Sequence, residues 1–311
     1  MEPEAPAIGR PSDSPPRQYP PHPAGIPPAV LGGGTYVARF ARDGRDLERI
    51  QKLRFEVFNR ELGEGLDASW KTGLDQDPYD EHCHHLMVLD GDADLVVGTY
   101  RVQTWDMARE GAGFYTAGEF DLSDLPPEMI ERSVETGRAC VHKDHRNGRV
   151  ITLLWKGLAS YMVHAKRSIL FGCCSLTSQD PHVARQTYDF LARGGFLHPR
   201  YRTLPRPDFV CYAPDFVPDV DVPFNLQALF AAYLKIGALV TGEPALDREF
   251  KTIDFLALLD TDQLDPAVRR TFYRHTEVEP APEPAATPAP WPPSLAGGSA
   301  AAGHPGAPRH P

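Results

Sequence analysis

The chain has 311 residues, with 32 Lys and Arg against 42 Asp and Glu, a net charge of −10. So acidic a composition excludes a protein that coats nucleic acid with its whole surface, and no apolar run reaches the roughly 18 residues that a bilayer span needs. The first residues lack the apolar core of a secretory signal. Five cysteines without a repeated spacing are typical of a reduced protein, so we expect a cytoplasmic location.

Both ends of the chain are rich in proline. Ten of the 32 prolines lie in residues 1–28, and ten more lie in residues 280–311. Such segments cannot bury enough apolar surface to offset their chain entropy, so we expect disorder over 1–34 and 276–311. The folded part is then a single domain over 35–275.

Within this domain the apolar residues alternate between the period of a strand and that of a helix. Strands are predicted over 35–40, 85–90, 95–102, 133–141, 168–176, 208–212 and 253–259. Helices are predicted over 45–63, over 151–166, between Asp180-Pro181 and Gly194-Gly195, and over 225–236. The mixture predicts an α/β fold, with a mixed central sheet flanked by helices.

Glu135 is the most informative charged residue, because an isolated carboxylate in a central strand is costly to bury. One interpretation is a structural ion pair with Arg101 or Arg138; the other is a general base. In a regular strand Glu135 and Arg138 would point to opposite faces. A bulge at Gly137 would bring them to the same face.

The segment 74–85 is acidic and contains Asp77 and Asp80 but no Lys or Arg. These carboxylates could hold Arg54, from the preceding predicted helix, or a cationic amine. The run Glu81–His85 contains histidines and a cysteine, but adjacent ligands rarely converge on one ion. No metal site is therefore expected.

Residues 138–167 carry a net charge of +6 in this acidic chain. A loop followed by a helix N-terminus with flanking cations suits a phosphate group. The patch consists of Lys143, Arg146, Asn147, Gly148, Arg149 and Lys156. It fits a compact anionic partner, such as a phosphopantetheine thioester or an acidic carrier protein. The alternative is a merely solvated charged face.

Several motifs in fixed order resemble the GNAT acyltransferase superfamily. LRFEVF, DPYD, VVGTYR and ETGRACV are similar to motifs of the acyl-homoserine-lactone synthases. A closer resemblance is to the bacterial ornithine lipid synthases, L-ornithine Nα-acyltransferases also labelled hemolysin-like. It rests on FYTAGEFDL (114–122), LLWKGLASY (153–161), FGCCSL (171–176), YLKIGA (233–238) and EPALDREFKTIDFLALLD (243–260). The resemblance covers roughly 36–275 and implies a GNAT-like fold.

The resemblance implies transfer of a 3-hydroxyacyl chain from acyl carrier protein to the α-amine of ornithine, giving lyso-ornithine lipid. No cofactor is implied beyond this acyl donor. The usual acetyl-coenzyme A motif is replaced by Arg-Asn-Gly-Arg, which favours acyl carrier protein over coenzyme A. The lipid product implies peripheral contact with a membrane, and no nucleic acid partner is expected.

The resemblance also implies a direct attack without an acyl-enzyme. Glu135 would accept the proton of the amine, and Arg101 and Arg138 would orient Glu135 and a substrate carboxylate. Asp77 and Asp80 would bind Arg54 or the amine. The alternatives are an acyltransferase acting on another amine, of the N-acyl amino acid or acyl-homoserine lactone type, and a non-catalytic protein that binds acyl carriers or membrane surfaces.

Overall fold

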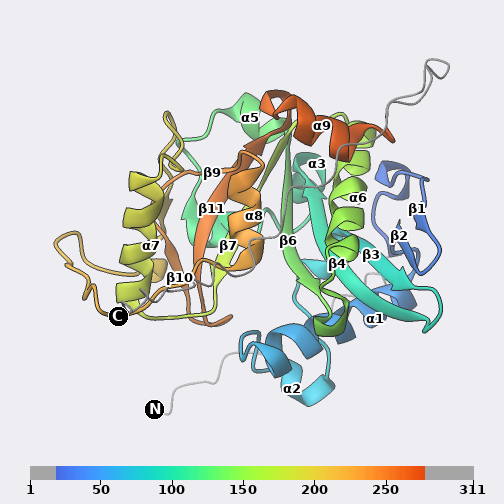
Figure 1. The fold of residues 1–311 in the computed structure, drawn as a ribbon, viewed down its shortest axis with the longest axis horizontal. Coiled ribbons are helices and arrows are strands. Elements are labelled where there is room, and N and C mark those ends of the chain that lie inside the picture. Colours follow the sequence, from blue (N-terminus) through green and yellow to red (C-terminus); the bar gives the residue numbers. More distant parts are fainter. Residues whose placement is uncertain (1–18, 277–311) are drawn as a thin grey trace, which may run out of the picture. The chain divides into compact units, whose positions relative to one another are not determined.

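One large mixed sheet forms the centre of the protein in the computed structural model, which describes residues 19–276 (Figure 1). The sheet has nine strands. In their order of pairing, eight of them are β1 (Leu31–Gly33), β2 (Tyr36–Phe40), β3 (His84–Asp90), β4 (Leu95–Thr104), β6 (Ser133–Val141), β7 (Ile169–Leu176), β11 (Thr252–Asp260) and β10 (Ala245–Asp247). The ninth, β9 (Leu239–Val240), pairs with β11. A separate small sheet pairs β5 (Phe120–Asp121) with β8 (Leu204–Pro205).

The α-helices of the described chain lie between and beyond these strands. They are α1 (Gly44–Arg54), α2 (Ser69–Thr72), α3 (Trp105–Glu110), α4 (Thr116–Glu119), α5 (Pro127–Glu131), α6 (Arg149–Ala165), α7 (Pro181–Arg193), α8 (Ala228–Lys235) and α9 (Pro266–Tyr273). A π-helical turn, Phe55–Glu61, continues α1, and Gly63 follows with a positive φ of 70°. None of the helices within residues 19–276 is long and apolar enough to cross a membrane.

The two faces of the sheet have different coverings. Helix α6 packs on β2, β3 and β4, where Leu154 joins Leu86 and Tyr100 in an apolar cluster. On the same side, α7 and α8 pack on β7 and β11, around Phe230 and Phe255. The opposite face is covered by α1 and its π-helical turn, and by α3 and α4. Side chains at alternate positions of each strand therefore face two different environments.

Strand β6 contains a bulge at Arg138. Between two paired positions, β4 has the single residue Tyr100 while β6 has both Arg138 and Ala139. Arg138 takes a positive φ of 51°, which is uncommon for a residue with a side chain. The extra residue bends β6, and of the two geometries left open by the sequence it selects a bulge, next to Gly137, over a regular strand.

The parallel pairing of β6 with β7 is very short. It runs from Ser133 opposite Ile169 to Glu135 opposite Phe171. Beyond this point β6 continues along β4 while β7 continues along β11. Figure 1 shows the two strands separating, and we call the space between them the wedge.

Most of the predicted elements are confirmed, but the strand predicted over 208–212 is wrong. A 3₁₀ turn over Pro207–Phe209 occupies its start, and only Val210 forms an isolated bridge, with Ala245. Pro207 has a fixed φ and no N–H to donate, which favours a turn over a ladder of strand hydrogen bonds.

The structure describes residues 19–34 and places regular elements in them, so the expected disorder over 1–34 is wrong for residues 19–34. The Tyr19 hydroxyl lies 2.9 Å from Nδ1 of His85, and Nε2 of His84 lies 2.6 Å from the Pro21 carbonyl oxygen. Leu31–Gly33 forms strand β1. Residues 1–18 and 277–311 lie outside the described part of the chain.

Gly172 marks the start of the wedge and allows a test of it. A Cβ atom at Gly172 would lie 2.0 Å from the carbonyl oxygen of Thr136, so the backbone would have to move. We expect Gly172→Ala to lower the free energy of unfolding by about 1–3 kcal/mol, measured by urea denaturation. The matched control is Gly137→Ala on the neighbouring strand, where a Cβ meets nothing within 4 Å. Equal stability of the two variants would contradict this description of the strand separation.

Candidate active site

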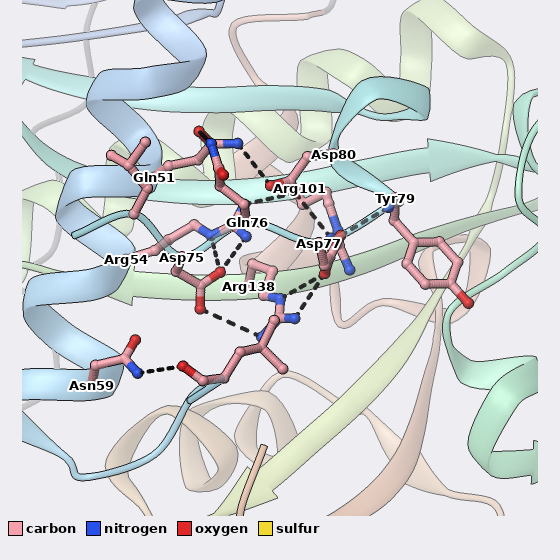
Figure 2. A network of polar contacts seen from close by, with 12 residues as sticks. Gln51, Arg54, Asn59, Asp75, Gln76, Asp77, Tyr79, Asp80, Arg101 and Arg138 are labelled. Carbon is pink, nitrogen blue, oxygen red and sulfur yellow. Dashed lines mark hydrogen bonds and ion pairs between the residues drawn. The ribbon is translucent and has the colours of Figure 1, made fainter. Parts of the chain in front are cut away.

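Three arginines and three aspartates form a buried network beside the wedge (Figure 2). We call it the Arg–Asp network; its members are Arg54, Arg101, Arg138, Asp75, Asp77 and Asp80. Arg54 comes from α1, Arg101 from β4 and Arg138 from β6, while the aspartates come from the loop before β3. Three positive and three negative charges balance each other, which reduces the cost of burying them.

The contacts within the network are specific. Arg54 donates from Nε to Asp75 at 2.9 Å and from Nη1 to Asp80 at 2.8 Å. Arg101 donates to both oxygens of Asp77 at 2.6 Å and to Asp80 at 3.0 Å. Although burial opposes ionisation, Arg101 and the other arginines hold the pKa of Asp77 below its ordinary range.

Asp77 also accepts a hydrogen bond of 2.7 Å from Nη2 of Arg138. Asp80 contacts Arg54, one of the two partners expected for it. Asp77 does not contact Arg54; it joins Arg101 to Arg138, and Asp75 is the second carboxylate bound to Arg54. Because all these side chains are buried and paired, the geometry favours a role in placing β4 and β6.

Glu135 lies at the last paired position of β6 and β7, with its side chain on the face opposite α6. Its Oε1 accepts hydrogen bonds from the backbone N–H and the hydroxyl of Thr116, both at 2.8 Å. Its Oε2 accepts one hydrogen bond, of 3.0 Å, from the backbone N–H of Tyr115. Four acceptor positions minus three bonds leave one position on Oε2. Burial raises the pKa of Glu135, and the bonds from Thr116 and Tyr115 counteract this effect.

The predicted ion pair of Glu135 with Arg101 or Arg138 is wrong, and so is the idea that these arginines orient it by direct contact. Both guanidinium groups are bound by Asp77, and both lie near the ring of Tyr115, at 5.6 and 5.7 Å. The N-terminal turn of α4 binds Glu135 instead. The bulge does place Glu135 and Arg138 on the same face, as predicted.

A cavity of about 690 Å³ passes through the wedge from one face of the sheet to the other. On the α6 side its lining is mainly apolar: Tyr100, Leu154, Trp155, Leu158, Tyr233 and Phe272. The side chains of α8 form part of this wall. An apolar cavity of this kind suits an alkyl chain.

The opposite end of the cavity is acidic. Five buried carboxyl groups lie in or behind its wall, and we call them the acidic cluster: Glu64, Glu119, Glu135, Asp247 and Asp254. Burial raises the pKa of Glu64 to about 7 and also raises the pKa of Asp254. Sequence reasoning gave no role to four of the five. Glu119 stands in FYTAGEFDL, and Asp247 and Asp254 stand in EPALDREFKTIDFLALLD. Both motifs were quoted for the family resemblance, and this was the available signal.

The predicted phosphate patch surrounds the N-terminus of α6, and several of its side chains have partners. Arg146 forms an ion pair with Glu61 at 2.6 Å, and Lys143 pairs with Asp144 at 3.3 Å. The side-chain oxygen of Asn147 accepts the N–H of Arg149, and Gly148 has a positive φ of 82°. The guanidinium of Arg149 lies 5.1 Å from the centre of the Tyr36 ring. Lys156 lies further along α6, half-buried.

The histidines and the cysteine of the run 81–85 are occupied by protein contacts. His84 lies 2.9 Å from the Tyr161 hydroxyl, and Nε2 of His85 lies 3.4 Å from Asp80. Burial raises the pKa of the Cys83 thiol and lowers the pKa of both His84 and His85. These residues form part of the core around β3.

Residues 53–156 match the family model described as an acetyltransferase (GNAT) domain. Together with the mixed sheet, this match defines a GNAT-type acyltransferase. The L-ornithine N(alpha)-acyltransferase of Rhodobacter capsulatus is 35% identical over 255 residues, covering 78% of this chain and 96% of the relative. The enzyme of the same name from Agrobacterium fabrum is 31% identical, over 74% of this chain and 83% of the relative. The chain therefore belongs to the L-ornithine N(alpha)-acyltransferase family.

Solved structures give a more distant similarity. The crystal structure of the AHL synthase LasI aligns with 78% of this chain and 96% of its own, at 12% identity and a TM-score of 0.41.

The Arg–Asp network predicts that two arginines near the same helix contribute very differently to the free energy of unfolding. Arg54→Met would leave Asp75 and Asp80 buried without their cation, so we expect a loss of about 3–5 kcal/mol in the free energy of unfolding. The control is Arg60→Met, whose side chain is 59% exposed and pairs with Glu56 at 2.9 Å. That change is expected to cost less than about 1 kcal/mol. Urea denaturation of both variants measures the difference, and similar losses would refute the assignment.

Proposed function

We propose that this acyltransferase moves a 3-hydroxyacyl chain from acyl carrier protein to the α-amine of ornithine. The observation that carries the proposal is the cavity through the wedge, which is apolar at one end and acidic at the other. An acyl chain fits the apolar end, and a cationic amino acid fits the acidic end. The names of the relatives support ornithine as the acceptor. A soluble carrier protein as donor would place the reaction in the cytoplasm.

In the proposed mechanism Glu135 is the general base. The free acceptor position on Oε2 takes a proton from the ammonium of ornithine, directly or through a water molecule. The neutral amine then attacks the thioester carbonyl, the new C–N bond forms, and the C–S bond breaks. The nitrogen gives its second proton to the departing thiolate, so the carrier leaves as a thiol. No acyl-enzyme forms in this sequence.

The divergence of β6 from β7 supports a role for the backbone in this step. Beyond Glu135, the edge of β6 that faces the wedge is not paired with β7. Those N–H groups of Ala139–Val141 that point away from β4 can donate to the oxygen of the tetrahedral intermediate. Donors fixed in a strand need little reorganisation when charge develops on that oxygen.

The basic patch at the start of α6 is proposed to bind the carrier protein and its phosphopantetheine. Gly148 begins the helix in a conformation with positive φ, and the N-terminus of a helix attracts phosphate. Lys143, Arg146 and Arg149 surround this point, and Arg146 is held in place by Glu61. Exposed charges of this kind act mainly on the rate of encounter.

The base assignment predicts different effects for two neighbouring variants. Glu135→Gln cannot accept the proton, so we expect kcat to fall by about 10²- to 10⁴-fold. Thr116→Val removes one hydrogen bond to Oε1 and should raise the pKa of Glu135. That variant should remain active, with the acid limb of its pH–rate profile moved to higher pH. Steady-state kinetics over a pH series tests both. A Glu135→Gln enzyme that keeps more than half its activity would show that Glu135 is not the base.

The carrier-protein assignment predicts an effect on KM that depends on salt. Charge reversal at both Arg146 and Arg149 should raise the KM for acyl carrier protein, with kcat at saturation little changed. The wild-type KM should rise with ionic strength, and the double variant should lose most of this dependence. An acyl-pantetheine donor that lacks the protein is the control and should be much less affected. An equally large rise in KM with both donors would mean that these arginines serve the chemistry or the fold.

A further inference from the structure

The acidic cluster has no cation of its own. None of its five carboxyl groups forms an ion pair with a Lys, Arg or His side chain within residues 19–276. The arginines on the cavity wall already have carboxylate partners: Arg101 and Arg138 are bound within the Arg–Asp network, and Arg146 is bound by Glu61. Buried carboxylates without a counter-ion are costly, so they are protonated or receive a cation from outside.

Two oxygens of the cluster have no hydrogen-bond partner among the described residues. They are Oδ1 of Asp254 and Oε1 of Glu119. Both residues are 2% exposed, and Asp254 lies in the cavity wall. Unpartnered polar atoms at this depth are rare in native proteins. Asp254 lies in the wall of the cavity, and the Glu119 carboxyl lies within 4.8 Å of it, behind that wall.

Two other members of the cluster, Asp247 and Glu64, accept hydrogen bonds from the protein. The Asp247 carboxylate accepts the N–H groups of Glu249 and Phe250 and the hydroxyl of Tyr115, at 2.7 to 2.9 Å. Glu64 accepts a hydrogen bond from Thr177. Apart from the free position on Oε2 of Glu135, the buried oxygens of the cluster without a partner are therefore those of Asp254 and Glu119.

The position of this pair relative to Glu135 can be followed along β7. Ligand atoms of Glu119, Cys173 and Asp254 all lie within 4.8 Å of one another. Cys173 lies two residues beyond Phe171, which pairs with Glu135. Two residues along a strand span about 6.6 Å. This separation is comparable with the length of a short, unbranched side chain that ends in an amine.

We propose that Asp254 and Glu119 bind the side-chain ammonium of the amino acid acceptor while its α-amine lies at Glu135. The pair thereby selects a basic amino acid over a neutral one of the same length. This inference rests on the proposed N-acyl transfer to an amino acid. It adds the residues that recognise the far end of that substrate.

A metal ion is the main alternative occupant of the same three side chains. Cysteine binds metals as a thiolate. Burial, together with the neighbouring Glu119 and Asp254, raises the pKa of the Cys173 thiol well above its ordinary value. The thiol is therefore neutral and donates to Oε2 of Glu119 at 3.5 Å, which leaves Oε1 of Glu119 and Oδ1 of Asp254 for an ammonium ion.

The test compares two acceptors of equal length, ornithine and norleucine, in which a methyl group replaces the ammonium. Wild-type enzyme should prefer ornithine in kcat/KM by about 100-fold or more, because a buried charge pair is lost with norleucine. Asp254→Asn and Glu119→Gln should each reduce kcat/KM for ornithine by about the same factor. Their activity with norleucine should change by less than about threefold. Glu249→Gln, which changes an exposed carboxyl in the turn between β10 and β11, is the matched control and should keep the wild-type ratio.

Each result has a separate meaning. The inference is overturned, and the proposed function is not, if Asp254→Asn and Glu119→Gln both keep the preference for ornithine. The same holds if the wild-type enzyme uses both acceptors equally. A wild-type enzyme that acylates neither amino acid overturns the proposed function as well.

Calorimetric binding of ornithine and norleucine to the wild-type full chain keeps the test valid if a variant does not fold. Tighter binding of ornithine supports the inference, and equal binding overturns it. Tight binding of Zn²⁺ that ornithine does not displace would assign the site to a metal and also overturn it.

Discussion

The structure depends on how early two parallel strands stop pairing. Strands β6 and β7 are joined over three residue pairs, and then each follows a different neighbour. Hydrogen-bonding edges that leave a sheet must be satisfied in another way, by side chains, water or a ligand. The separation creates a passage through a sheet that would otherwise divide the molecule into two closed faces. It also places Glu135 at the point where the passage begins.

The two faces of the sheet supply different kinds of side chain to the cavity. The face towards α6 and α8 supplies apolar side chains, such as Trp155 and Tyr233. The opposite face supplies charged groups, in two sets with different character. The Arg–Asp network is balanced internally and holds β4, β6 and the loop before β3 together. The acidic cluster is unbalanced. A balanced buried set favours rigidity, and an unbalanced one favours binding of an ion from outside.

Much of the fold could be predicted from the sequence, because its long elements carry clear periodicity. The strand over 133–141 and the helix capped by Asp180 have the predicted positions. The contact of Arg54 with Asp80 was also accessible, since both lie in a short stretch of chain. The partners of Glu135 could not be predicted, because Tyr115 and Thr116 lie at the start of a four-residue helix, α4, which is too short to show a periodic pattern. Ion pairs between distant segments, such as that of Arg146 with Glu61, leave no recognisable pattern in the local sequence either.

The bulge in β6 has a consequence that concerns chain length. Between two paired positions, β6 uses two residues where β4 uses one. A related chain that lacked one of these residues would keep each later side chain on its present face, because alternation would become regular. It would, however, lose the bend and the left-handed conformation of Arg138. A straighter β6 would follow β7 further and narrow the passage. The opening through the sheet thus depends largely on the number of residues in β6, which has one extra position. It depends much less on the chemistry of the side chains around it.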